Sequence, residues 1–388
     1  MNCLLRDFVQ SGEVEIRTGP FGTQLKASEY VEQGTPVLNV KNLGYSTVVK
    51  SKLDRVGPST IERLSMHILH RGDIVFGRKG AVDRHAYISS DEDGWMQGSD
   101  CIRVRVKTET INPRFLSYYF LTPEHRAFMI SMCSHGTTMA SLNQKILEMI
   151  EVPLPDRSVQ DGIVSLLGIL DNKIELNQKI NENLERQMQA IFKYHVNGKE
   201  FNGCLADICQ YSKERVAVSS LTLDSYYSTE NMLPGKTGAT QAAALPTTVQ
   251  TTGCRTGDVL VSNIRPYFKK IVYCQSECGC STDVLCFRPK SPELSAFLFN
   301  TLYNDRFFDF MVAGSKGTKM PRGDKQQIMT YPVSIPSESE VKSFNAMVNP
   351  VLKQINRNKM ENNRLALLRD TLLPKLMSGE IDISDIQI

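Results

Sequence analysis

The chain repeats itself, and this internal repeat limits the folds open to it more than any other feature of the sequence. Residues 72–75 (GDIV) recur as 257–260 (GDVL), and the pair Gly-Thr at 136–137 recurs at 317–318. The separation between matched residues drifts between 179 and 185 in the first part of each half, and it stays at 181 from Gly136 onward. A drifting separation indicates loops of different length, and a constant one indicates a rigid element. Each half is therefore predicted to be a variable globular part followed by a constant part.

The constant part of each half carries a heptad pattern. Apolar residues and asparagines alternate at spacings of four and three residues over about four heptads, which predicts one long helix in each half with a buried seam. The predicted seam residues are Ile163, Leu167, Leu170, Ile174, Asn177, Asn181 and Leu184 in the first half, and Phe344, Val348, Val351, Ile355, Asn358, Asn362 and Leu365 in the second.

Both helices have predicted ends. Asp156 and Ser337 stand at N-cap positions, and Glu340 would complete a capping box with Ser337. Gly198 and Gly379 follow the last seam residues, where a left-handed C-cap is expected.

Two equivalent seams in one chain can cover each other. Each seam also holds two asparagines at matched positions, and buried seam asparagines fix register and orientation at a cost in stability. We predict that the helices pair antiparallel within the chain, which relates the two halves by a pseudo-two-fold axis. Pairing between two chains, as in a homodimer zipper, is the alternative.

The predicted fold class is mixed α+β. Short alternating segments such as 101–106 and 283–287 are typical of strands, and Pro113 and Pro292 open short amphipathic helices. The predicted order is two globular α/β domains, each followed by a long helix of an antiparallel coiled coil. The predicted boundaries are 1–155 for the first domain, 156–198 for the first helix, 199–336 for the second domain, 337–379 for the second helix and 380–388 for a C-terminal tail.

Composition and charge narrow the class of protein. With 41% apolar residues and a net charge of +3, the 388-residue chain is an ordinary globular protein without a polybasic surface, so any nucleic-acid site must be local. Residues 1–10 do not look like a signal peptide, and we expect a cytoplasmic protein with its ten cysteines as thiols. Cys274, Cys278, Cys280 and Cys286 could instead bind zinc, but they lack the C-x2-C pairs typical of such sites.

No catalytic motif is found. The segment 235–237 (GKT) imitates the end of a phosphate-binding loop, but Glu230 occupies the place of its first glycine. No glycine-rich cofactor turn follows a predicted strand, and the six histidines form no ligand cluster. The globular parts are therefore interpreted as recognition modules.

Basic and hydroxyl residues recur at two equivalent places in each half, and such side chains bind phosphates and base edges. A solvated surface loop is the alternative for each place taken singly. The candidate nucleic-acid contacts are Arg78, Lys79, Arg84, His135, Thr137 and Thr138 in the first half, and Asn263, Arg265, Lys269, Lys270, Lys316, Thr318, Lys319 and Arg322 in the second.

The sequence resembles the specificity (S) subunits of Type I restriction–modification systems. The resemblance rests on 19–26 (GPFGTQLK), 34–37 (GTPV), 257–266 (GDVLVSNIRP), the Gly-Thr turn at 317–318 and the stretch 368–381. The first of these segments adds Thr23 and Lys26 to the candidate contacts, although it has no counterpart in the second half.

The resemblance implies two target-recognition domains, each reading one half of a bipartite double-stranded DNA target, on helices that set the gap between the halves. It implies two methyltransferase subunits that bind S-adenosylmethionine, and restriction subunits that use ATP and magnesium. The S subunit itself would then have no active site, cofactor or metal and no membrane partner. A duplicated coiled-coil scaffold without DNA binding is the alternative function.

Overall fold

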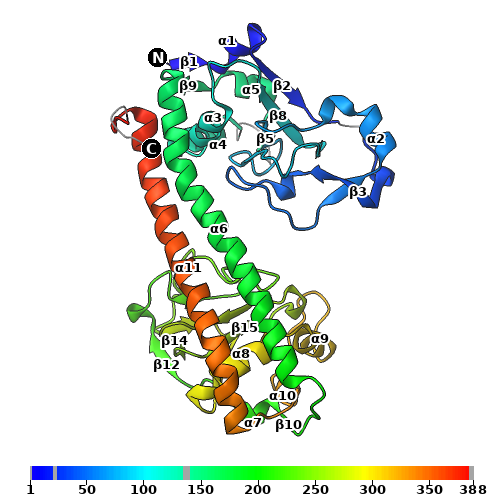
Figure 1. The fold of residues 1–388 in the computed structure, drawn as a ribbon, viewed down its shortest axis with the longest axis vertical. Helices are drawn as coiled ribbons and strands as arrows, with labels where there is room; N and C mark the ends of the chain where they lie inside the picture. Colours follow the sequence, from blue (N-terminus) through cyan, green and yellow to red (C-terminus); the bar gives the residue numbers. More distant parts are fainter. Residues whose placement is uncertain (1, 21–23, 134–139, 384–388) are drawn as a thin grey trace. The chain divides into compact units, whose positions relative to one another are not determined.

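The computed structural model describes residues 2–20, 24–133 and 140–383, and its contacts divide the chain into two compact units (Figure 1). The first unit is Met1–Ile174 with Asn363–Ile388, and the second is Glu175–Asn362. Each unit thus contains one globular part and a portion of both long helices. The boundaries predicted at 155, 198, 336 and 379 treat each long helix as a separate segment, whereas the two units divide both helices between them. These boundaries stay a prediction.

The first unit is built on a four-stranded antiparallel sheet, in which strands distant in sequence are neighbours. A three-stranded sheet lies in the same unit. In spatial order, the strands are β2 (Val14–Thr18), β8 (Cys101–Val106), β5 (Ile74–Gly77) and β6 (His85–Tyr87), then β4 (Asp54–Val56), β3 (Tyr30–Leu38) and β7 (Met96–Gln97).

The second unit has a four-stranded antiparallel sheet with the same topology, which is the structural counterpart of the sequence repeat. Its second sheet has four strands and includes one parallel pair. In spatial order, the strands are β11 (Cys209–Tyr211), β18 (Val284–Pro289), β15 (Val259–Ser262) and β16 (Ile271–Tyr273), then β12 (Arg215–Ala217), β14 (Gln250–Cys254), β17 (Cys278–Cys280) and β13 (Tyr226–Tyr227).

Short helices and one strand pair complete each globular part in matching order, except that α2 has no counterpart among the described α-helices of the second unit. In the first unit these elements are β1 (Asn2–Leu4), α1 (Leu5–Gln10), α2 (Pro58–Arg63), α3 (Pro113–Tyr119), α4 (Pro123–Cys133), α5 (Gln144–Glu148) and β9 (Glu151–Pro153). In the second they are β10 (Gly203–Cys204), α7 (Leu205–Ile208), α8 (Ser295–Tyr303), α9 (Asp305–Ala313), α10 (Lys325–Met329) and β19 (Pro332–Val333). The strand pairs β1–β9 and β10–β19 join the start of each half to its end.

Matched capping residues start the equivalent helices. The Asn112 side chain accepts hydrogen bonds from two backbone N–H groups at the start of α3, where Pro113 supplies the fixed φ of a first-turn residue. Asn143 caps α5 by accepting one backbone N–H, and Asp324 caps α10 by accepting two; these two residues are 181 positions apart. The constant spacing seen in the sequence therefore reflects a helix start that both halves share.

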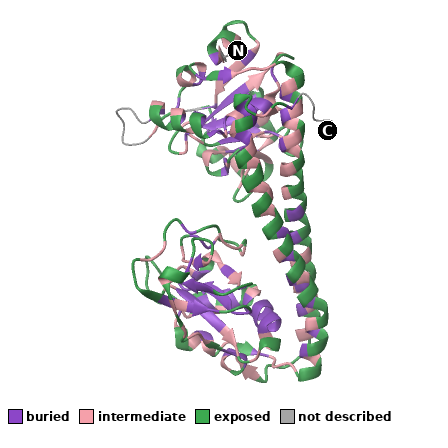
Figure 2. Ribbon diagram, turned by 90° about the vertical axis from the view of Figure 1, so that its left-hand side faces the viewer, coloured by how far each residue is buried: buried purple, intermediate pink, exposed green. Residues whose placement is uncertain are grey.

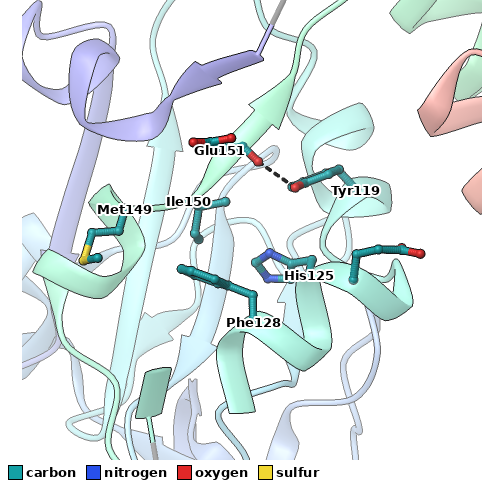
Figure 3. A pocket seen from close by; sticks show the side chains of 7 residues that line it. Tyr119, His125, Phe128, Met149, Ile150 and Glu151 are labelled. Carbon is teal, nitrogen blue, oxygen red and sulfur yellow. Dashed lines mark hydrogen bonds between the residues drawn. The ribbon is translucent and has the colours of Figure 1, made fainter. Parts of the chain in front are cut away.

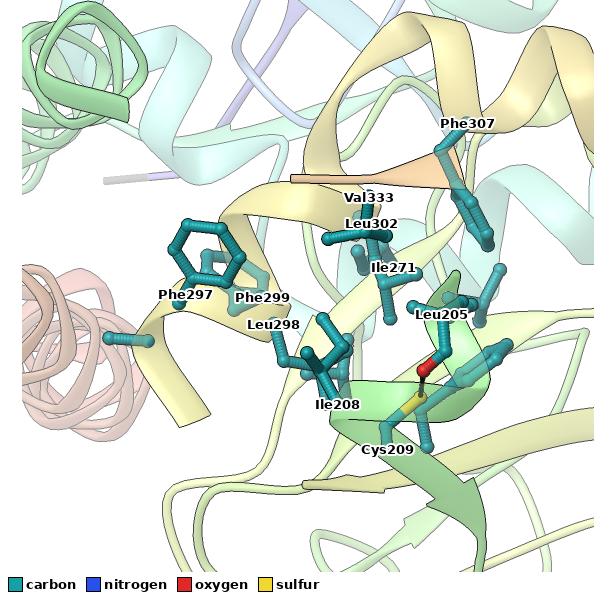
Figure 4. Packing of buried hydrophobic residues seen from close by; sticks show 14 of the residues in the cluster. Leu205, Ile208, Cys209, Ile271, Phe297, Leu298, Phe299, Leu302, Phe307 and Val333 are labelled. Carbon is teal, nitrogen blue, oxygen red and sulfur yellow. Dashed lines mark hydrogen bonds between the residues drawn. The ribbon is translucent and has the colours of Figure 1, made fainter. Parts of the chain in front are cut away.

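Aromatic side chains fill the core of the second unit. Phe287, Phe307 and Phe308 have no exposed surface, and Phe297 and Phe299 of α8 join the same cluster (Figure 4). Burying one such side chain contributes about 1.5–3 kcal/mol. Figure 2 shows the buried residues concentrated on the sheet strands within each unit.

The long helices are α6 (Arg157–Val196) and α11 (Glu338–Ser378). The predicted capping box is present, because the backbone N–H of Ser337 donates to a Glu340 carboxylate oxygen at 2.8 Å and the Ser337 hydroxyl accepts from the Glu340 N–H at 3.4 Å. Gly198 and Gly379 have φ values of 72° and 76°, the left-handed conformation expected after a helix.

Within each unit, α6 and α11 contact each other in opposite directions. In the second unit, Asn181 accepts a hydrogen bond from Asn358 at 2.8 Å, and Asn177 donates one to Asn362 at 2.9 Å. In the first unit, Arg369 donates to Asp171 at 2.9 Å. Residues later in α6 therefore pair with residues earlier in α11, as in an antiparallel contact.

The predicted seam residues are all buried or half-buried. The buried ones are Ile163, Leu167, Asn177, Asn181, Phe344, Val348, Ile355 and Asn358. The half-buried ones are Leu170, Ile174, Leu184, Val351, Asn362 and Leu365. Among the described residues, no helix has the length and apolar character needed to cross a membrane.

The paired asparagines give a test of the helix contact in the second unit. We expect Asn181→Ala to lower the free energy of unfolding by about 1–3 kcal/mol, because it leaves the buried Asn358 amide without its acceptor. Replacing both Asn181 and Asn358 with leucine should cost less than that single change or stabilise the protein. Urea denaturation measures both effects, with the exposed Lys353→Ala as a control. A double variant less stable than Asn181→Ala would contradict the contact.

Candidate nucleic-acid interface

A buried carboxylate fixes the start of each strand that leads into a candidate loop. Asp73 precedes β5 and is 1% exposed, and Arg105 of β8 holds it through two hydrogen bonds of 2.7 Å. Asp258 precedes β15, is also 1% exposed, and is held by Arg288 of β18 at 2.7 and 3.1 Å. The hydrogen bonds to Asp258 raise the pKa of Arg288 above its ordinary value. Two-pronged arginine–carboxylate contacts are strong and directional, so both strands have a fixed starting point.

In the first unit, the segment after β5 meets the segment that follows 134–139. The N–H of Leu142 donates to the carbonyl of Arg78 at 2.8 Å, and the N–H of Gly80 donates to the carbonyl of Ala140 at 3.0 Å. Lys79 and Ser141 form an isolated antiparallel β-bridge. The two candidate places of this half, separate in sequence, are thus joined by backbone hydrogen bonds.

The second unit repeats this junction at the equivalent positions. Ile264 and Arg322 form an isolated antiparallel bridge, and Arg322 is the counterpart of Ser141 at the constant spacing. The N–H of Arg265 donates to the carbonyl of Pro321 at 2.8 Å, and the N–H of Gly323 donates to the carbonyl of Asn263 at 3.2 Å. The loop 314–325 therefore lies against the segment 263–270.

Several basic side chains at the second junction are paired with carboxylates. Lys316 contacts Asp324 at 2.7 Å, and this hydrogen bond raises the pKa of Lys316. Arg322 contacts Asp283 at 3.1 Å. These cations are partly neutralised before any ligand arrives.

Other cations of this junction have no carboxylate contact within the described part of the chain. Lys319 and Thr318 are exposed. Arg265 donates to the carbonyl of Lys319 at 3.4 Å. Lys270 donates to the carbonyl of Thr229, and partial burial lowers its pKa. Lys319 is therefore an exposed cation whose charge no carboxylate of the described chain neutralises.

The turn between β15 and β16 has an unusual backbone. Arg265 and Lys269 have φ values of 50° and 52°, a region that non-glycine residues rarely adopt, and they flank the short 3-10 helix Pro266–Phe268. Such conformations cost about 1–3 kcal/mol each and cluster at binding sites. The turn exposes 48% of Tyr267 beside these two cations. Sequence reasoning did not select Tyr267, because nothing in its neighbours signals the left-handed turn.

Other candidates stand apart from the loop junctions or are less accessible. Lys269 contacts Asp305 at 2.7 Å, and Asn263 is only 8% exposed. Lys26 is exposed and lies beside Glu29 at the start of a 3-10 turn before β3. Thr23, His135, Thr137 and Thr138 lie outside the described residues.

In the first unit, Arg84 and Lys79 are exposed and Arg78 is half-buried. The Arg84 guanidinium lies 5.5 Å from the centre of the Tyr45 ring, and Lys79 is 3.9 Å from Asp100. None of these predicted DNA contacts is tested by the structure, and they stay predictions.

Five of the seven cysteines of the second unit gather in one place, and Cys204 and Cys209 lie outside it. Cys254, Cys274, Cys278, Cys280 and Cys286 belong to one buried cluster, and the sulfur atoms of Cys274 and Cys278 are 3.5 Å apart. All ten cysteines are free thiols. Among the described residues, no group of three or more potential ligands is placed to hold a metal ion.

Comparison with solved structures shows the class of fold. The chain is similar to the S subunit of a Type I restriction–modification system from M. genitalium, with a TM-score of 0.56 and 13% identity, over 97% of this chain and 95% of that one. This similarity shows a mixed α/β fold of the S-subunit type.

Sequence comparisons find similar proteins of the same kind. Residues 15–186 match the model of the Type I restriction modification DNA specificity domain. The MjaVIII specificity subunit of Methanocaldococcus jannaschii is 24% identical over 48% of this chain, and the match covers 44% of that relative. The MjaIX specificity subunit of the same organism is 20% identical over 93% of this chain and 90% of the relative. Residues 15–186 are thus similar to the DNA specificity domain, and the chain as a whole is similar to the S subunits named above.

The buried Asp–Arg pairs generate a prediction about stability. We expect Asp258→Asn to destabilise the protein by about 1.5–3 kcal/mol, because the charge-assisted hydrogen bonds from Arg288 to the buried carboxylate are lost and Glu214 remains as the only carboxylate partner of Arg288 within the described chain. Thermal or urea unfolding measures the change, and the exposed Asp309→Asn is the matched control. Unfolding of the Asp258 variant at the wild-type midpoint would show that the pair does not anchor β15.

Proposed function

We propose that this chain is the sequence-specific, double-stranded DNA-binding subunit of a Type I restriction–modification complex. Each globular domain reads one half of a bipartite target. The chain is not an enzyme, and S-adenosylmethionine, ATP and magnesium are used by partners, namely two methyltransferase subunits and the restriction subunits. The match of residues 15–186 to the DNA specificity domain supports this proposal, as does the similarity to relatives named as specificity subunits.

The observation that carries the proposal is the repeated loop junction. Segments selected from the sequence for their basic and hydroxyl side chains are joined by equivalent backbone bridges, Lys79 to Ser141 and Ile264 to Arg322. A protein that only holds partners through its helices has no need for the same basic junction in both globular parts. Two similar surfaces in one chain suit a target with two half-sites.

We further propose that α6 and α11 act as an antiparallel coiled-coil spacer under a pseudo-two-fold axis. The asparagine pairs of the second unit and the Arg369–Asp171 contact of the first support this role. Pairing of this kind would hold the two domains at a fixed separation and dock the methyltransferase subunits.

Binding to random duplex DNA at increasing salt tests the proposal. Lys319→Ala should weaken binding by about five- to tenfold at 0.1 M salt and lower the slope of log K against log salt by about one, as expected for one lost phosphate contact. Lys353→Ala, which removes an exposed lysine from α11, is the control. Absence of any duplex binding by the folded wild-type chain, even at low salt and with its partner subunits present, would favour the scaffold alternative.

The spacer role predicts a change in target spacing. Four residues inserted into both helices, after Ile174 and after Leu365, add about one turn, or roughly 6 Å, and keep the seam nearly in phase. One base pair of DNA rises about 3.4 Å, so the preferred gap should lengthen by one or two base pairs. Selection of bound sites from a library with variable gaps measures this. An unchanged gap in a folded, DNA-binding variant would assign the spacing to other parts of the complex.

A further inference from the structure

The first unit has an open cavity of about 320 Å³ between α4 and the end of α5 (Figure 3). Nothing in the proposed DNA contacts uses it. Its lining residues are Tyr119, Glu124, His125, Phe128, Met149, Ile150 and Glu151.

The cavity has an apolar interior with one unsatisfied polar group. His125 is 3% exposed, and its Nδ1 atom has no hydrogen-bond partner within the described part of the chain. Burial lowers the pKa of His125 to about 3, so the imidazole is neutral at pH 7. Phe128 and Ile150 face the same space (Figure 3), whereas Glu124 and Glu151 are exposed at its rim.

The internal repeat provides an equivalent place in the second unit. Ile150 and Tyr331 are 181 positions apart and follow equivalent helices, α5 and α10. Their carbonyl groups accept equivalent backbone hydrogen bonds. The carbonyl of Ile150 accepts from the N–H of Leu5 at 2.9 Å, and the carbonyl of Tyr331 accepts from the N–H of Leu205 at 2.8 Å. The side chain at this position therefore points from the same backbone site in both units.

Aromatic rings also correspond. Phe307 and Phe310 of α9 are the counterparts of His125 and Phe128, since the pattern of buried and exposed residues along α4 matches that along α9. In the second unit, the Tyr331 ring packs against Phe307 and Phe310 at centroid distances of 5.4 and 5.3 Å. In the first unit, isoleucine stands in place of this tyrosine, and the rings that pack against His125 within the described chain are those of Tyr119, Phe120 and Phe128.

We propose that the cavity of the first unit binds a tyrosine side chain of a partner polypeptide, in the place that Tyr331 fills within the second unit. An apolar cavity of about 150 Å³ already holds benzene, so this one has room for a phenol ring. Tyr331 shows that the occupant of the equivalent place is a side chain carried by a polypeptide.

The rim of the cavity specifies the flanking residues of that tyrosine. Glu124 and Glu151 place two carboxylates at the opening. Basic residues beside the tyrosine would meet opposite charge there, whereas acidic ones would be repelled. The partner segment is therefore a tyrosine between lysines or arginines.

Titration of the full chain with capped tripeptides tests the proposal. Acetyl-lysyl-tyrosyl-lysyl amide should bind with a millimolar Kd, at least tenfold more tightly than the lysyl-alanyl-lysyl and glutamyl-tyrosyl-glutamyl peptides. Changes in the His125 imidazole signals, followed by NMR, locate the site. Equal affinity for the tyrosyl and alanyl peptides would overturn the proposal, as would binding that leaves His125 unperturbed.

Two variants and a small probe sharpen the test. Ile150→Tyr places a tyrosine where the second unit has one and should fill the cavity. The affinity for the lysyl-tyrosyl-lysyl peptide should then fall at least tenfold. Met66→Tyr, at an exposed site, should leave this affinity unchanged. Glu151→Gln keeps the size of the side chain but removes its charge, and it should lower the affinity for the same peptide several-fold. This variant tests the proposal if Ile150→Tyr does not fold. Undiminished binding in either folded variant would overturn it. Binding of p-cresol without binding of the peptide would instead make the cavity a small-molecule site.

Discussion

The arrangement of each globular part depends on one contact, between a buried aspartate and a half-buried arginine. Asp73 and Asp258 sit where the chain enters the central sheet, and each also accepts a backbone N–H, from His70 and Arg255 respectively. A buried carboxylate without such partners would be strongly destabilising. The strand that follows is therefore held in one register, and the loop at its far end emerges at a fixed place.

In the long helices, it is a hydrogen bond between asparagines that fixes the register. Apolar contacts along α6 and α11 give association energy but tolerate sliding, whereas the hydrogen bond between Asn181 and Asn358 forms in one register only. Arg369 stands four residues after the seam residue Leu365, where it continues the heptad spacing with a charge. Asp171 neutralises this charge, and Arg114 of α3 donates to the same carboxylate. The helix contact of the first unit is thereby linked to its globular part.

The sequence was sufficient for features that depend on local chemistry and period. The helices α6 and α11, the capping box at Ser337 and Glu340, and the repeat itself follow from heptad spacing and cap residues. The bridge between Ile264 and Arg322 was not predictable, because it joins segments far apart in sequence through backbone groups that every residue has. Left-handed conformations such as that of Lys269 also leave no sequence signal, since only glycine or asparagine would normally indicate them.

Duplication also explains why one unit can carry a feature that the other lacks. Backbone contacts that start and end each globular part are the same in both, so side chains on that frame can diverge without loss of the fold. Tyr331 closes an aromatic cluster in the second unit, whereas Ile150 leaves the corresponding surface open in the first. In the first unit, the Nδ1 atom of His125 lacks a hydrogen-bond partner within the described chain, which costs stability. The second unit has Phe307 at the equivalent position and avoids this cost. A difference of this kind between otherwise equivalent units is where their roles in an assembly can differ.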